Sequence, residues 1–232
     1  STLMRSSAAS DVYKRQDVDT IMLKYAKLGV ATGFAFDWGE YFDVTLKNEV
    51  QYIMEHPDLP VTYRDIDRPR AGNVNEMLKN EGKKKEKELN APLEAYNAVA
   101  MEVGEISKQC AYDISMRDYL LGRMEKGDTI VAGVFHRPDS NGHLAGFANE
   151  NPHYVNAVRN ADLYLCDLLD AVEQREKQFN EKWLVLVAAD HGGSKQGHGK
   201  QVAEHRTIWM ACNYPVEQKY FGVHYNGFQE ER

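Results

Sequence analysis

Two short polar segments of the chain carry the residue types that bind divalent metal ions. The first reads "DSNGH" from Asp139 to His143, and it follows an apolar run. The second reads "DHGGSKQGH"; it begins with Asp190 and His191 after another apolar run and ends at His198. Carboxylate oxygens and imidazole nitrogens are common ligands of zinc, manganese and iron. Together the two segments predict a metal site shared by two strand ends.

Each segment taken alone also has an ordinary structural explanation. An Asp and a Gly close together, as in Asp139 and Gly142, are typical of a solvated turn. Asp190 after a strand is typical of a helix N-cap, and His198 of an exposed loop residue. The strand before Asp190 is so apolar that we expect it to be buried on both faces, where an unpaired carboxylate costs several kcal/mol. The two segments together therefore favour the metal site.

The composition excludes several classes of protein. The chain has 232 residues and a formal net charge of −7, which gives no general attraction to nucleic acid or to anionic membranes. Its three cysteines form no CxxC pair, so they predict neither a disulfide framework nor a thiolate zinc site. No stretch approaches the roughly 20 apolar residues of a membrane span.

The chain divides into a short leader and one domain. Residues 1–16 have no apolar periodicity, and we interpret them as a non-native or disordered leader of the kind that translated adapter sequence produces. Residues 17–232 are interpreted as one domain. A surface insertion is expected at about 64–95, which includes the mixed charge run "NEGKKKEKELN".

Apolar runs alternate with amphipathic helical patterns along this domain. Strands are predicted at 30–36, 128–135, 183–189 and 206–212, with 128–135 suited to the centre of the sheet and an edge strand at about 61–63. Helices are predicted at 17–28 and 151–179, and a loop at 136–147. This alternation predicts an α/β fold with a mostly parallel sheet and helices on both faces. Ligands of such sheets bind beyond the carboxyl ends of the strands, where both polar segments lie.

Residues from about 128 to 210 resemble the C-terminal part of the alkaline phosphatase superfamily, in particular its type I phosphodiesterase/nucleotide pyrophosphatase family. The motifs that carry the resemblance are "PDSNGH", "YVNAVRNAD", "AADHGG" and "GHGK", in that order. The resemblance extends less firmly back to about residue 19. It implies an alkaline-phosphatase-like three-layer sandwich that is incomplete at its N-terminus.

The resemblance also implies a two-ion metal centre. Asp139, His143 and His198 would bind the first of two divalent ions, most often Zn²⁺. Asp190 and His191 would contribute to the second ion.

Other residues have weaker implied roles. His136, which ends its strand beside the site, and Arg206, which follows the last ligand closely, are candidate substrate-binding residues, although a strand-end histidine and an ion pair explain them equally well. The family's nucleophile, a Thr or Ser that forms a covalent intermediate, has no counterpart here. Thr20 aligns after that position, and Asp37 is interpreted as a turn or cap residue instead of the second-ion carboxylate. The chain is therefore expected to be an inactive fragment.

The resemblance implies a hydrolase of phosphodiester or phosphoanhydride bonds that acts on a small phosphorylated substrate such as a nucleotide. It also implies export to the periplasm or the cell exterior. Three alternatives stay open: a non-catalytic, metal-stabilised binding domain, a protein that uses a single iron for oxygen chemistry, and another superfamily activity such as phosphomonoesterase, phosphonate hydrolase or sulfatase. Sulfatase is disfavoured, because sulfatases usually have Asp-Asn where this chain has Asp190-His191.

Overall fold

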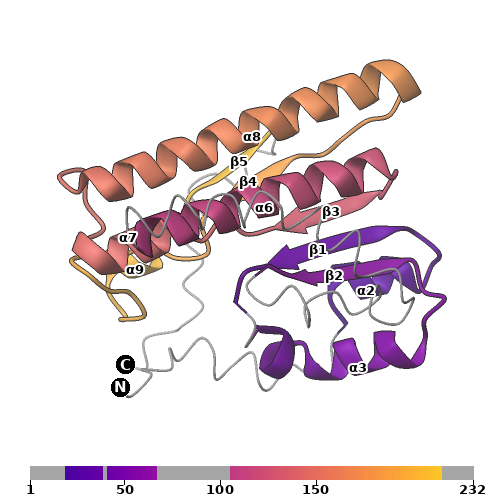
Figure 1. Cartoon of the computed structure of the whole chain (residues 1–232), viewed down its shortest axis with the longest axis horizontal. Helices are drawn as coiled ribbons and strands as arrows, with labels where there is room; N and C mark the ends of the chain where they lie inside the picture. Colours follow the sequence, from indigo (N-terminus) through magenta and orange to yellow (C-terminus); the bar gives the residue numbers. More distant parts are fainter. Residues whose placement is uncertain (1–18, 39–40, 67–104, 216–232) are drawn as a thin grey trace.

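The structure is a computed structural model that describes residues 19–38, 41–66 and 105–215 (Figure 1). The predicted leader at 1–16 and most of the predicted insertion at 64–95 lie outside these ranges. Within the described part of the chain, no helix is both long enough and apolar enough to cross a membrane.

Three parallel strands form the central sheet. They are β1 (Thr32–Phe36), β2 (Val61–Asp65) and β3 (Ile130–Gly133), in the order β2-β1-β3. Thr32 of β1 pairs with Val61 on one side and with Ile130 on the other. The sequence predicted these strands to within a few residues. However, β3 was expected in the middle of the sheet, and among the described strands β1 holds that place.

Helices cover both faces of this sheet (Figure 1). One face carries α2 (Ile21–Ala26) and α3 (Lys47–Glu55), and the other carries α6 (Glu105–Glu125) with α8 (Pro152–Phe179) packed along it. A single π-helical turn, η1 (Tyr41–Thr45), precedes α3. These layers confirm the predicted α/β sandwich with helices on both sides of a parallel sheet.

The alternation of apolar side chains along β1 explains why helices pack against both faces of the sheet. Phe34 and Phe36 pack into a core formed with α2 and α3, which includes the buried side chains of Leu23 and Ile53. Ala35, between the two phenylalanines, is buried against α6 on the opposite face. Because successive side chains of a strand point to opposite faces, one apolar strand supplies both cores.

The predicted strand before Asp190 differs from expectation. The observed strands β4 (Leu186–Ala188) and β5 (Met210–Cys212) form a separate, antiparallel two-stranded sheet. Leu186 is 58% exposed, so the prediction of a strand buried on both faces was wrong. Among the described residues β4 pairs with β5 alone. The apolar composition of a strand does not determine which neighbouring elements pack against it.

The first polar segment is helical and not a loop. Helix α7 spans Arg137–Ala145 and begins with a proline in its first turn. The short helix α9 (Ala203–Arg206) follows the second polar segment. Gly, Ser and Asn are weak helix formers, which is why the sequence predicted a turn. Packing of α7 against α8 and α6 outweighs that local preference.

Candidate metal centre

Helix α7 places Asp139 and His143 on one face, because residues four apart lie one turn above each other. Asp139 Oδ2 lies 3.4 Å from His143 Nε2. The helix is anchored at its C-terminal end by the buried Asn151, whose side-chain amide donates to the carbonyl of Asn141 at 3.0 Å and of Gly146 at 2.8 Å. The helical geometry thus aligns two of the predicted ligands.

His198 completes a group of three potential ligands. Its Nε2 lies 3.4 Å from Asp139 Oδ1, and one ligand atom from each of Asp139, His143 and His198 lies within 4.8 Å of the other two. Ligand atoms around one zinc ion lie about 3 to 3.5 Å apart, given bond lengths near 2.1 Å. The two Asp139–histidine distances of 3.4 Å match this spacing, and the structure therefore brings together the residues predicted for the first ion.

The ring nitrogens of two histidines are already oriented for metal binding. His143 Nδ1 lies 3.0 Å from the carbonyl oxygen of Gln196, and His191 Nδ1 lies 3.0 Å from the carbonyl oxygen of Gly192. A carbonyl can only accept, so Nδ1 carries a proton in each ring, and the neutral form of each ring has its lone pair on Nε2. Such backbone contacts are the usual way in which proteins orient metal-binding histidines.

A buried carboxylate oxygen gives the strongest sign that an ion fits. Asp139 Oδ1 is buried and has no hydrogen-bond partner among the described residues. It faces His198 Nε2 at 3.4 Å and His191 Nε2 at 3.7 Å. An unpaired buried carboxylate oxygen is costly, and a divalent cation removes that cost. The donor set of one carboxylate and imidazoles suits zinc.

Protonation in this cluster also favours ligands over cations. Partial burial, together with the charge of His191, lowers the pKa of His198 and so favours the neutral ring that binds metal. Burial alone would raise the pKa of Asp139, but the hydrogen bond from His136 and the electrostatic effect of the neighbouring histidines outweigh it and lower that pKa.

His136 lies between two carboxylates. Its Nε2 is 3.3 Å from Asp139 Oδ2, and its Nδ1 is 3.3 Å from Oδ1 of the buried Asp37, which follows β1. The interaction with Asp139, followed by that with Asp37, raises the pKa of His136 to about 10. The ring is therefore a cation that offsets the negative charges of both carboxylates. Asp37, which was interpreted as a turn or cap residue, also contacts this cation.

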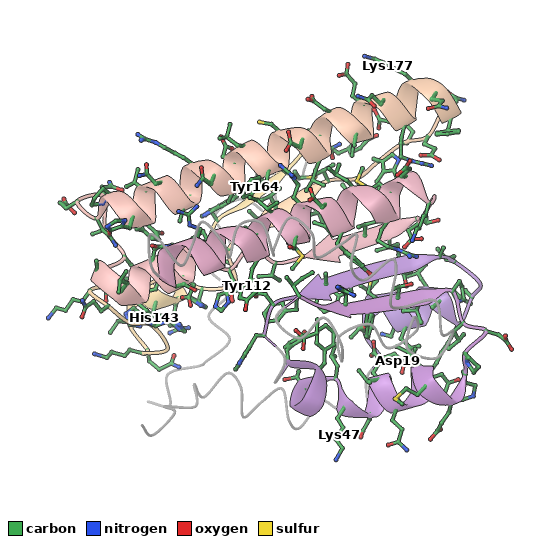
Figure 2. The ribbon with its side chains drawn as sticks, in the orientation of Figure 1. Asp19, Lys47, Tyr112, His143, Tyr164 and Lys177 are labelled. Carbon is green, nitrogen blue, oxygen red and sulfur yellow. The ribbon has the colours of Figure 1, made fainter. Side chains whose placement is uncertain are left out.

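The remaining predicted residues lie at the edge of the cluster. The side chain of Asp190 is 83% exposed, with Oδ2 at 3.6 Å from His191 Nε2. The ring of His191 stacks on that of His198, with centroids 3.7 Å apart. Arg206 is exposed at the end of α9. Figure 2 shows His143 at the opposite end of the helical layer from Lys177, which places the cluster at one end of the molecule.

Sequence reasoning missed two kinds of supporting residue. Phe147 packs edge-on against the rings of His143 and His198, with centroids 5.4 and 6.2 Å away. A Cβ on Gly142 or Gly193 would overlap the Phe147 ring, so these glycines provide its space. No local motif marks such a phenylalanine, because its contacts come from distant parts of the chain.

Asp113 is the second missed residue. It lies on α6, is almost fully buried, and accepts hydrogen bonds from the backbone N–H groups of Arg137 and His136 at the start of α7. The residue at the N-cap position of α7 forms no side-chain cap of its own. Asp113 thus caps, from another helix, the element that carries Asp139.

We expect Asp113 to make folding stability depend on pH. Burial, then the charge of Asp37, raises the pKa of Asp113 to about 7, against about 4 in an unfolded chain. Between these values the unfolded state loses the proton first, so the contribution of Asp113 to stability falls as pH rises from about 4 to 7 and changes no further above that. Asp113→Asn should remove this fall, which is on the order of a few kcal/mol, in urea unfolding across that pH range.

The matched control for that measurement is Asp118→Asn, on the same helix. Asp118 is partly exposed and pairs with Arg117 at 2.7 Å. The control should keep the wild-type slope. An Asp113→Asn protein with an unchanged slope would contradict the role assigned to the Asp113 carboxyl.

The parallel sheet with helices on both faces, and the Asp/His cluster near the ends of β1 and β3, define an α/β protein with a candidate metal centre. The family model for type I phosphodiesterase / nucleotide pyrophosphatase matches residues 20–209, and the chain belongs to this family. No curated protein and no solved structure was found to match it. The family acts on phosphodiester and nucleotide substrates and is generally metal-dependent. The family resemblance of the motifs is therefore confirmed.

Proposed function

We propose that this protein is a metal-dependent hydrolase of phosphodiester or phosphoanhydride bonds, with Asp139, His143 and His198 as ligands of one divalent ion. The donor set suits Zn²⁺. The observation that carries the proposal is the buried, unpartnered Asp139 Oδ1 facing imidazole nitrogens. Among the described residues, these three form the one group of three or more metal-ligating side chains within reach of one another.

We extend the proposal to a second ion, to which Asp190 and His191 contribute. Asp190 is exposed, and His191 directs its Nε2 towards both Asp190 and Asp139. When bound, a pair of divalent ions neutralises phosphate charge and stabilises the attacking and leaving oxygens. The chain's own contribution is to hold neutral imidazoles in place and to balance Asp37 and Asp139 with the His136 cation.

The covalent step of the family mechanism requires a Thr or Ser nucleophile. No residue of this chain matches the family's nucleophile motif, so we propose that the chain as given binds metal ions without hydrolysing substrate. The substrate is proposed to be a small nucleotide or phosphodiester, with His136 and Arg206 near it. We propose export from the cytoplasm because members of the family are often secreted.

Zinc is expected to stabilise the protein. If one ion binds the folded chain alone, a free Zn²⁺ concentration of 100 times Kd should add about 2.7 kcal/mol to the free energy of unfolding. Thermal unfolding with Zn²⁺ and with a chelator measures this shift, and elemental analysis gives the stoichiometry. Hydrolysis of bis(4-nitrophenyl) phosphate by the chain should be absent.

The natural sequence upstream of residue 17 distinguishes the proposed hydrolase from the alternative, a non-catalytic binding domain. If that upstream sequence encodes a strand ending in Asp and then a loop with a Thr or Ser, a protein that includes it should show zinc-dependent hydrolysis. Zinc uptake with a natural upstream sequence lacking both would favour a non-catalytic binding domain. One bound iron and no hydrolysis in the restored protein would contradict the proposed function.

A further inference from the structure

We propose that His205 is a positioning residue, which holds the segment after His191 in the shape that lets His198 reach Asp139 and His143. The inference rests on the proposed function, since it concerns the same metal centre. Within the described part of the chain, His205 forms no hydrogen bond or ion pair with the proposed ligands of the first ion.

His205 contacts the segment at three points. It is buried, and its ring Nε2 lies 2.7 Å from Ser194 Oγ. Its Nδ1 accepts a hydrogen bond from the backbone N–H of Lys200 at 3.0 Å, and its carbonyl oxygen accepts one from the N–H of Gly192 at 3.0 Å. These contacts fall on both sides of His198, so one residue anchors both ends of the segment.

The hydrogen bonds determine which ring nitrogen carries the proton. The backbone N–H of Lys200 can only donate, so Nδ1 of His205 has the lone pair. The proton of the neutral ring therefore lies on Nε2, which donates it to Ser194 Oγ. Without a lone pair on Nε2, His205 cannot take the Ser194 proton. The short contact is thus structural, and it is not a Ser–His nucleophile pair.

The middle of the anchored segment contacts helix α7. Ser194 and Gly197 form two reciprocal backbone hydrogen bonds across a tight turn, with N–O distances of 3.0 and 3.2 Å. Between them, Gln196 accepts from the ring of His143 and donates its side-chain amide to the carbonyl of Leu144 at 3.1 Å. Fixing both ends of the segment therefore holds His143 and its neighbour His198 in place relative to each other. Metal binding then does not have to order these side chains, which lowers the entropy cost of binding.

The test replaces the ring in the full chain and measures binding of Zn²⁺ alone. His205→Phe removes both ring hydrogen bonds, and we expect Zn²⁺ to bind roughly 10- to 100-fold more weakly. The Lys200 amide should also exchange faster with solvent. His205→Asn, whose side-chain oxygen takes the place of Nδ1, should restore part of the Lys200 protection. His56→Phe is the control, since His56 is exposed at the end of α3, and it should bind Zn²⁺ as the wild type does.

Nitrogen NMR of the metal-free wild type tests the proton position directly and does not depend on a variant that folds. A proton on Nε2 of His205 supports the proposal, and a proton on Nδ1 overturns it. Wild-type zinc affinity in a folded His205→Phe protein also overturns it. If the wild type binds no zinc, the proposed function fails, while the Nε2 proton and the Lys200 exchange rate still decide whether His205 anchors this segment.

Discussion

Replacing Asp139 with asparagine is expected to weaken zinc binding by at least roughly 100-fold, the largest effect of any single ligand. Asp139 is the one carboxylate in the three-ligand group, and its oxygens face His136, His143 and His198 at 3.3 to 3.4 Å. Asparagine keeps the shape but removes the negative charge that attracts a cation. Isothermal titration with Zn²⁺ measures the affinity.

Two further variants make that experiment specific. Asp190→Asn alters the exposed carboxylate proposed for the second ion, so it should lower the zinc stoichiometry and leave the tighter site in place. Asp162→Asn changes an exposed residue of α8 and should have no effect. An Asp139→Asn protein that binds zinc with wild-type affinity and stoichiometry would exclude Asp139 as a ligand and remove the main support for the proposed site.

The sequence predicted the layers of the fold because the strands of the central sheet are short, apolar and bounded by clear helical patterns. It also predicted which side chains gather, since the segments from Asp139 and from Asp190 both follow strands. The family match over residues 20–209 agrees with the motifs that carried the resemblance. Hydrophobic periodicity indicates local structure, and the order of the motifs indicates the order of the elements along the chain.

Contacts between distant residues account for what the sequence did not predict. The segment with Asp139 is a helix because α6 supplies a cap through Asp113 and the buried Asn151 anchors the other end, and neither contact is visible locally. The run before Asp190 is exposed because burial depends on which neighbours pack against a strand. Its apolar composition alone cannot report those neighbours.

The second large effect is expected at Gly192, immediately after His191. A Cβ at Gly192 would lie 2.1 Å from the carbonyl oxygen of Glu204 and 2.9 Å from that of Thr207, both of which are backbone atoms. The N–H of Gly192 also donates to the carbonyl of His205, so the two segments are held together. Gly192→Ala should therefore cost about 2 to 5 kcal/mol of folding free energy and weaken zinc binding.

Gly197 is the matched control, because it lies beside His198 in the same segment and a Cβ there meets nothing within 4 Å. Neither glycine has a positive φ, so the comparison isolates the space available to one methyl group. Gly197→Ala should change stability by less than about 1 kcal/mol, since alanine also reduces the freedom of the unfolded chain. Denaturant unfolding and zinc titration of both variants make the test. Equal stabilities would mean that the segment moves away from α9 at little cost, and that close packing does not fix the position of His191.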